Sequence, residues 1–271
     1  MTELQKQIKS ALERVRDTSP LVHHITNYVT VNDCANVTLA IGASPIMADD
    51  IGEAADIASI SSSLVLNIGT LNTRTVESML LAGKAANKAG VPVVLDPVGA
   101  GASALRNETL KKLLDEVKMT LIRGNVSEIS YLAGISSSVR GVDASEEDIK
   151  KNKKELAAAA ALKYGCTVAV TGAVDVVCDG ERWAFLSNGT PSLSRVTGTG
   201  CMSTSLCGAF CGAKIDPFVA ATGALCAMGI AGELADEAGP MGTSSFRTGV
   251  IDALSLLTGE ALAKRAKIHE E

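Results

Sequence analysis

The stretch from Val196 to Met202 combines two glycines, two threonines and a thiol directly before a long apolar segment rich in alanine, glycine and cysteine. The first N–H groups of a helix have no partner inside it, and the helix dipole adds partial positive charge there. Glycine lets the backbone turn sharply and approach a ligand. A helix beginning here would cradle a phosphate, with Gly198, Gly200 and Cys201 as candidate catalytic positions. Taken alone, the stretch is equally compatible with a turn before a core helix that buries the thiol.

Polar residues with complementary chemistry follow several apolar runs of strand length. They are Asp96, Arg123, Glu128 and Thr171. Two carboxylates facing phosphates commonly hold Mg²⁺, and the planar fork of arginine suits phosphate oxygens. Each residue also has an ordinary structural interpretation: Asp96 as a turn residue, Arg123 and Glu128 as a surface ion pair, and Thr171 as a helix cap. Their shared position after strands favours one common site.

The elements that must position these residues alternate along the chain. Apolar runs of strand length occupy residues 20–27, 44–47, 64–68, 91–95, 120–122 and 167–170, with helical segments between them. This alternation is typical of a three-layer αβα fold, in which helices cover both faces of a mostly parallel central sheet. Ligands of such sheets bind beyond the carboxyl ends of the strands. We expect residues 1–271 to form a single domain.

Two further features complete the expected fold. The dipeptide Asp179-Gly180 lies between two strand-like segments and predicts a small antiparallel hairpin at the edge of the sheet. The sequence from the glycine-rich stretch onward predicts three helices, over residues 201–213, 217–238 and 248–267. The polar stretch that ends near Glu146 predicts a loop or flap.

Composition excludes several classes of protein. The chain has 271 residues, 46% of them hydrophobic, and a net charge of −5, so a large core is expected and disorder is not. No basic stripe with interleaved aromatic residues appears, which argues against nucleic acid as a partner. Charged residues interrupt every candidate membrane span, and the N-terminus has no apolar signal region. The seven cysteines include no Cys-x-x-Cys pair, as expected for reduced thiols in a cytoplasmic protein.

Two common nucleotide-binding motifs, the P-loop and the dinucleotide fingerprint, do not explain the candidate phosphate site. The P-loop pattern Gly-x-x-x-x-Gly-Lys-Ser/Thr is absent from the sequence. Gly99-x-Gly101-x-x-Ala104 follows a predicted strand and is a weak dinucleotide fingerprint, but Asp96-Pro97 separates that strand from the glycines. We therefore prefer a phosphate site at the glycine-rich stretch from Val196 to Met202 over a dinucleotide site at Gly99.

Taken together, the motifs resemble those of the hydroxyethylthiazole kinase family, within the ribokinase-like superfamily. The matching pieces are His24–Asn27, Pro45–Ala48, Asn67–Thr70, Asp96–Gly101, Arg123–Asn125 with Glu128, Gly198–Cys201, Gly239-Pro240 and Ser245-Phe246. They extend from residue 24 into the C-terminal helices. The segment from Gly239 to Phe246 departs from the family pattern because it is longer than the usual Gly-Pro-Gly-Ser-Phe turn.

The resemblance implies ATP-dependent phosphorylation of the primary hydroxyl of 4-methyl-5-(2-hydroxyethyl)thiazole in thiamine biosynthesis or salvage. It implies a homotrimer with active sites between subunits. The implied ATP-binding residues are Arg123, Thr171 and Asn125, and the implied Mg²⁺-binding residues are Asp96 and Glu128. The implied substrate-binding residues are Met47, Gly198, Asn27 and Gly69. Residue type alone favours a core position for Met47, because methionine commonly fills gaps in cores.

Cys201 stands where kinases of the superfamily usually place the aspartate that accepts the alcohol proton. A free thiol has a pKa of about 8.5, against about 3.9 for aspartate. At neutral pH the thiol is therefore mostly protonated, whereas the aspartate carries the negative charge that accepts a proton. Phosphoryl transfer depends mainly on positioning and electrostatics, so a weak base can suffice. We expect Cys201 to lie beside the reacting hydroxyl and to contribute modestly.

Two other functions fit the same pattern. One is a kinase for another small alcohol, such as a sugar, a nucleoside or a pyrimidine. The other is a nucleotide-binding sensor that keeps the phosphate cradle but transfers no phosphoryl group.

Overall fold

The computed structural model describes residues 1–135 and 146–271. The helices are α1 (Glu3–Thr18), α2 (Val31–Ile41), α3 (Ala54–Ile60), α4 (Thr73–Ala89), α5 (Ala104–Glu116), α6 (Val126–Ala133), α7 (Glu146–Tyr164), α8 (Thr199–Gly212), α9 (Pro217–Glu237), α10 (Thr243–Leu256) and α11 (Gly259–Arg265), with the 3₁₀ turn η1 (Pro191–Arg195). The strands are β1 (Leu21–Ile25), β2 (Ser44–Met47), β3 (Ser63–Asn67), β4 (Val93–Asp96), β5 (Leu121–Asn125), β6 (Thr167–Thr171), β7 (Asp175–Cys178), β8 (Trp183–Leu186) and β9 (Ile268–Glu270). Most of the predicted polar loop or flap lies outside the described residues.

In the described part of the chain, the strands form one sheet in the order β2-β1-β3-β4-β5-β6-β7-β8-β9. Neighbours from β2 to β6 run parallel, and β7, β8 and β9 add antiparallel strands at one edge. The predicted mostly parallel sheet with an antiparallel edge is therefore confirmed. Asn67 pairs with Asp96, and Asn125 with Thr171. These pairings bring the carboxyl ends of four strands to one edge of the sheet.

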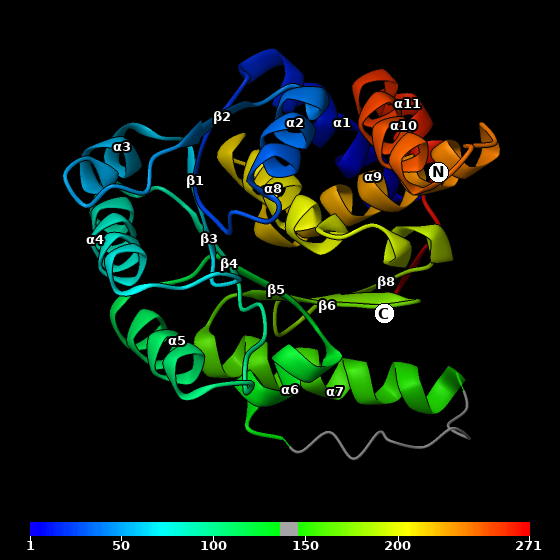
Figure 1. Ribbon diagram of the computed structural model, residues 1–271. Helices are drawn as coiled ribbons and strands as arrows, with labels where there is room; N and C mark the ends of the chain where they lie inside the picture. Colours follow the sequence, from blue (N-terminus) through cyan, green and yellow to red (C-terminus); the bar gives the residue numbers. More distant parts are fainter. Residues whose placement is uncertain (136–145) are drawn as a thin grey trace.

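Helices cover both faces of this sheet, as Figure 1 shows. One core lies beneath α1, α2, α8, α9, α10 and α11, and includes Val22, Val65 and Phe210. The other lies beneath α3 to α7, and includes Leu64, Leu66 and Leu95. Neighbouring residues of one strand, such as Leu64 and Val65, enter opposite cores because side chains alternate across a strand. The three-layer architecture thus follows from continuous apolar runs buried on both faces.

The helix α9 is part of the core. Among the described residues it is the one helix long and apolar enough to cross a membrane, and its most apolar stretch is 89% buried inside the fold. It packs against α1, α8 and α10. An apolar helix surrounded by protein on all sides is expected in the core of a large α/β domain.

The C-terminal segment differs from the sequence-based expectation. The single helix predicted over 248–267 is two helices, because Thr258 caps a new one by accepting a hydrogen bond from the backbone N–H of Ala261. The short strand β9 then pairs with β8 and was not predicted. Three residues are too few to show a strand pattern in the sequence.

Two smaller corrections concern strand ends. Asp179 N–H donates to the carbonyl of Arg182, so the hairpin turns at Gly180-Glu181, one residue later than predicted. The strand β5 continues to Asn125 rather than ending at residue 122. The side chains of Arg123 and Asn125 therefore project from the strand itself.

Candidate active site

The helix α8 begins one residue after Gly198, whose φ of +88° lies in the left-handed region. A Cβ at this position would lie 2.4 Å from Cγ2 of Thr30, so a side chain has no room there. The Gly198 carbonyl accepts a hydrogen bond from Met202 N–H at 2.8 Å, which starts the helix. The predicted helix start at the glycine-rich stretch is confirmed, two residues earlier than expected. Residues of its first turn, whose N–H groups have no partner inside the helix, line two cavities that share Gly200.

The first of these, the central cavity, has a volume of about 380 Å³ and lies beyond the carboxyl ends of β3, β4 and β5. Its lining residues are Asn27, Val29, Thr30, Gly69, Thr70, Asp96, Val98, Arg123, Asn125, Glu128, Thr197, Gly198, Gly200 and Cys201. The strand pairing and the start of α8 therefore bring together most of the predicted site residues.

Asp96 lies at the end of β4 and is fully buried. Oδ2 accepts hydrogen bonds from Asn67 Nδ2 at 2.9 Å and from Thr204 Oγ1 at 2.8 Å. Oδ1 has no hydrogen-bond partner within residues 1–135 and 146–271. Burial raises the pKa of Asp96 to about 6, against the opposing charge of Arg123. A buried carboxylate oxygen without a partner is an acceptor held ready for a cation or a donor.

Glu128 occupies the first turn of α6 and spans two neighbouring segments. Oε2 accepts from the N–H of Asn125 at 2.8 Å, while Asn125 Oδ1 accepts from the N–H of Glu128, which forms a capping box. Oε1 accepts from Gly99 N–H at 3.0 Å. Glu128 thus fixes the loop after β4 to the end of β5. Each of its oxygens keeps a second lone pair for another partner.

Cys201 stands in the first turn of α8, and its sulfur faces amide donors. Nδ2 of Asn27 and Nδ2 of Asn67 each lie 3.3 Å from Sγ. Burial and the nearby Asp96 charge raise the pKa of the Cys201 thiol, while hydrogen bonds from Thr30, Asn67 and Asn27 oppose that rise. In the described chain all seven cysteines are free thiols, and Cys201 is the half-buried one.

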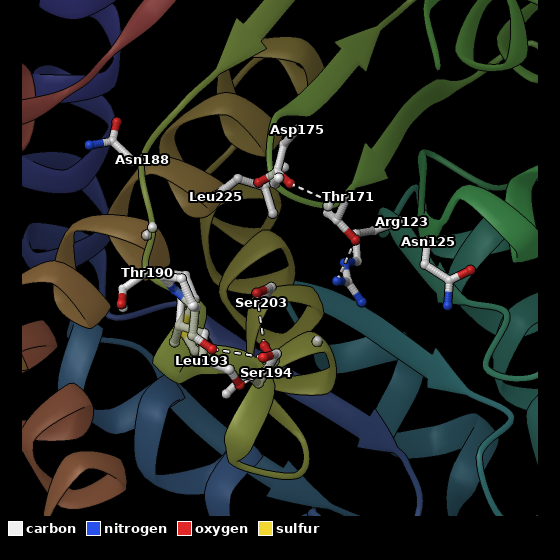
Figure 2. A pocket seen from close by; sticks show the side chains of 18 residues that line it. Arg123, Asn125, Thr171, Asp175, Asn188, Thr190, Leu193, Ser194, Ser203 and Leu225 are labelled. Carbon is white, nitrogen blue, oxygen red and sulfur yellow. Dashed lines mark hydrogen bonds between the residues drawn. The ribbon is translucent and has the colours of Figure 1, made fainter. Parts of the chain in front are cut away.

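The second cavity, the edge cavity, has a volume of about 600 Å³ and lies between the ends of β5 and β6 and the segment 188–194. Arg123 Nη2 donates to Thr171 Oγ1 at 2.6 Å. Figure 2 shows these two side chains on one wall, with Asn188, Thr190 and Leu193 across the space. Thr199, Gly200 and Ser203 of α8 line the same cavity, so Arg123 and Thr171 share it with the start of this helix.

Asp175 also lines the edge cavity and was not predicted. Its Oδ1 accepts from Gly172 N–H at 2.8 Å, which closes the turn between β6 and β7. Burial raises the pKa of Asp175 to about 6. Neither the residue type nor its place in a predicted hairpin distinguishes Asp175 from an ordinary turn residue in the sequence.

The two cavities share Arg123, Asn125 and Gly200. A Cβ at Gly200 would lie 2.6 Å from Nη1 of Arg123, so the glycine leaves room for the guanidinium beside the helix start. One arginine can thus reach a charged group that extends from one cavity into the other.

Met47 lies apart from both cavities. It ends the edge strand β2, opposite His24 of β1, and its side chain is 36% exposed. The core position that its residue type favoured is therefore wrong. Among the described strands β2 has no neighbour on its outer side, which leaves the side chain open to solvent or to another molecule.

Besides Asp175, two further residues of the site were missed in the sequence. Asn67 ends β3, and Arg106 lies in the first turns of α5. The guanidinium of Arg106 donates to the carbonyls of Ile68, Gly69 and Val98, so it joins the loops after β3 and β4. Asn67 could have been found by the same signal as Asp96, because both are polar residues that end buried strands. Arg106 could not be found in this way, because it lies on an amphipathic helix and not at the end of a buried strand.

The residues present fit a divalent cation at the central cavity. Oδ1 of Asp96 has no partner in the part of the chain that the structure describes, and Glu128 lines the same space. Clusters of three or more His, Cys, Asp or Glu are not found among the described residues. Mg²⁺ commonly takes one or two protein carboxylates and completes its coordination with water and substrate phosphates.

Comparisons with known proteins agree with this geometry. The family model described as "Hydroxyethylthiazole kinase family" matches residues 12–260. The chain is 60% identical to a hydroxyethylthiazole kinase of Ruminiclostridium cellulolyticum over 100% of both chains. It is 58% identical to one of Clostridium beijerinckii over 99% of both.

Solved structures give the same relationship. A hydroxyethylthiazole kinase from Pyrococcus horikoshii OT3 has a TM-score of 0.89 and 42% identity, covering 97% of this chain and 98% of the other. Pyridoxal kinase from Staphylococcus aureus, solved in complex with AMP-PCP, has a TM-score of 0.59 and 17% identity over 78% of this chain and 86% of its own. The second likeness concerns the fold alone, which is ribokinase-like. With the sequence match over most of its length, the chain belongs to the hydroxyethylthiazole kinase family.

Proposed function

We propose that this protein transfers the γ-phosphoryl group of ATP to the primary hydroxyl of 4-methyl-5-(2-hydroxyethyl)thiazole, in thiamine biosynthesis or salvage. The observation that carries the proposal is the position of the start of α8, which opens on both cavities beside Arg123. Such a start stabilises negative charge through backbone N–H groups and the helix dipole. A phosphoryl group in transfer needs this kind of support.

ATP is assigned to the edge cavity, with its phosphates directed toward Arg123 and the start of α8. Arg123, Thr171 and Asn125 are the proposed ATP-binding residues. Their support is that all three line a cavity of about 600 Å³, in the size range of small-molecule sites. The apolar wall that includes Leu225 and Met228 suits the flat base.

The metal assignment concerns Asp96 and Glu128. These two carboxylates are the proposed Mg²⁺-binding residues, directly or through water. When bound, the ion would neutralise charge on the phosphates. Asp96 would contribute its free Oδ1, and the two backbone hydrogen bonds to Glu128 would hold that carboxylate in place. The hydrogen bonds from Asn67 and Thr204 to Oδ2 hold the Asp96 carboxylate in place in the same way.

The thiazole alcohol is assigned to the central cavity, with its hydroxyl beside Cys201. Asn27, Gly69 and Gly198 line this space. A Cβ at Gly69 would lie 2.9 Å from both Asn27 Cβ and Asn67 Oδ1, so a side chain at this position would displace one of these two residues. Cys201 is the proposed acceptor of the alcohol proton or the group that orients the hydroxyl.

Met47 and the assembly belong to the same proposal. We expect a homotrimer in the cytoplasm, with active sites between subunits. Its support is a group of exposed apolar side chains near the carboxyl ends of β1 and β2, including Tyr28, Val29, Met47 and Ile51. Met47 would then reach the thiazole of a neighbouring subunit. Sizing chromatography with light scattering measures the assembly directly, and a monomer would contradict it.

The activity is tested by a coupled ADP-release assay with Mg·ATP and a panel of alcohols. We expect saturable turnover with the thiazole alcohol, and little with a sugar, a nucleoside or a pyrimidine alcohol. Preferred turnover of another alcohol would overturn the substrate assignment. ATP binding without turnover of any alcohol would favour a nucleotide-binding sensor. An assay without alcohol measures the background hydrolysis of ATP.

A further inference from the structure

The side-chain amide of Asn67 uses all its hydrogen-bonding capacity within the site. Asn67 is 2% exposed at the end of β3. Nδ2 donates to Asp96 Oδ2 at 2.9 Å and to Cys201 Sγ at 3.3 Å. Oδ1 accepts from Gly69 N–H at 2.9 Å and from Asn27 Nδ2 at 3.0 Å. One amide therefore contacts four residues that the sequence had already marked as candidates for the site.

The orientation of this amide follows from its partners. The backbone N–H of Gly69 can only donate, so the oxygen of Asn67 must face it. The neighbouring amide of Asn27 is fixed in the same way, because its Oδ1 accepts from the N–H of Thr30 at 3.1 Å and from the Thr30 hydroxyl at 3.0 Å. Both NH₂ groups are consequently turned toward Cys201.

Two N–H donors at one sulfur are more than a neutral thiol requires. A thiol is a weak acceptor, whereas a hydrogen bond to a charged acceptor is about twice as strong as a neutral one. The pair of amides therefore suits an atom that carries negative charge at position 201. The same NH₂ group of Asn67 also serves Asp96, and Thr204 of α8 donates to that carboxylate. The start of α8 is thus tied to β3 and β4 through a few polar atoms.

We propose that Asn67 is a positioning residue that holds the Asp96 carboxylate and the Cys201 sulfur in one fixed arrangement at the phosphoryl-transfer position. Through its two N–H groups it aims a donor at each of them. The kinetic part of this proposal rests on the proposed kinase function. Other charged groups beside Asp96 are Arg123 of β5 and Glu128 of α6, and neither contacts Cys201 in the hydrogen bonds of the described residues.

A double-mutant cycle tests the link to Cys201. In the otherwise unchanged protein, Asn67→Ala should lower kcat about 10-fold to 100-fold, the range for losing a hydrogen bond to a charged group. In a Cys201→Ala background the same change should lower kcat less, by about 3-fold, because part of its effect acts through the absent sulfur. KM for both substrates should change little. Equal losses of kcat in the two backgrounds would overturn the proposal.

Alkylation of Cys201 gives a readout that does not require turnover. We measure its rate with iodoacetamide at pH 8 by peptide mass spectrometry, with the six buried cysteines as internal references. Asn67→Asp keeps the shape of the side chain but replaces donors with a carboxylate. It should slow alkylation of Cys201 about 10-fold or more, since the thiolate loses a donor and faces a negative charge.

A matched control separates this effect from added charge. Asn87→Asp introduces the same change at the far end of α4, where Asn87 bonds to Lys118, and should leave the alkylation rate of Cys201 unchanged. An unchanged rate in folded Asn67→Asp protein would overturn the proposal. If Asn67→Asp does not fold, the double-mutant cycle of Asn67→Ala with Cys201→Ala tests the positioning role instead. If the protein phosphorylates no alcohol, the alkylation comparison still decides the positioning role while the proposed function fails.

Discussion

Arg123 of β5 donates from Nη2 to Oγ1 of Thr171 at the end of β6, across 2.6 Å. This bond holds the guanidinium at the boundary between the edge cavity and the central cavity. Nε of Arg123 is buried and has no hydrogen-bond partner among the described residues. The side chain therefore retains donor capacity in a place where an anionic group would meet it.

Replacing this arginine by lysine should impair ATP use. Arg123→Lys keeps the positive charge but loses the planar fork, which matters where two oxygens are held at once. We expect kcat/KM for ATP to fall about 100-fold, with KM for the thiazole alcohol changing far less. Steady-state kinetics with each substrate varied in turn measures both. Arg182→Lys, in an exposed ion pair remote from the cavities, is the control. Equal kinetics for the two variants would remove Arg123 from the ATP site.

The glycine before α8 should be intolerant of any side chain. Gly198→Ala combines a left-handed backbone with a Cβ only 2.4 Å from Thr30, so it should lower the free energy of unfolding by about 2–3 kcal/mol. Gly90→Ala is the matched control, because its φ is +71° and no described atom lies within 4 Å of the added Cβ. It should cost about 1 kcal/mol. Urea unfolding measures both, and equal losses would contradict the contact with Thr30.

The buried carboxylate of Asp96 should lower the free energy of unfolding of the metal-free protein. Its pKa is about 6 instead of the usual 3.8 because of burial. A raised carboxyl pKa means that the folded state loses stability as pH rises from about 4 to 6. Asp96→Asn removes this penalty, so it should raise the free energy of unfolding by up to about 3 kcal/mol above pH 6 and by little near pH 4.

Thermal unfolding of metal-free Asp96→Asn at pH 8 and pH 5 tests the sign. The gain in Tm over the unchanged protein should be larger at pH 8, while kinase activity falls about 100-fold or more. Asp252→Asn, on the exposed face of α10, should alter neither. A Tm gain of the same size at both pH values would show that titration of Asp96 is not its cause.

Cys201 should contribute modestly to turnover. Since phosphoryl transfer depends mainly on positioning and electrostatics, Cys201→Ala should lower kcat by no more than about 10-fold. Cys201→Asp should keep or raise kcat, because the two amide donors would face a carboxylate, which is a stronger acceptor than a thiol. The coupled assay at saturating substrates measures both. Unchanged turnover in both variants would remove Cys201 from the chemistry.

The matching control for this series is Cys166, a buried thiol at the amino end of β6, away from both cavities. Cys166→Ala should leave kcat unchanged while lowering the free energy of unfolding by about 1 kcal/mol. A fall in kcat as large as that of Cys201→Ala would point to a general effect of losing a core thiol.

The sequence by itself determined the layered fold and the edge of the sheet at which the site lies. Apolar runs that alternate with helices require a parallel sheet covered on both faces. Parallel strands also end at the same edge, so Asp96, Arg123 and Thr171 were predicted to meet before any contact was known. The start of α8 could also be predicted from local sequence, because two glycines and a following apolar segment mark it.

Only the tertiary structure decided which atoms face one another. Asn67 and Cys201 lie 134 residues apart, and their contact depends on how α8 packs against β3. The same packing turns both amides toward the sulfur and leaves Oδ1 of Asp96 without a partner among residues 1–135 and 146–271. The exposure of Met47 on an edge strand likewise depends on strand order. Local sequence patterns specify what an element is, whereas the pairing of distant side chains is set by the packing of the whole chain.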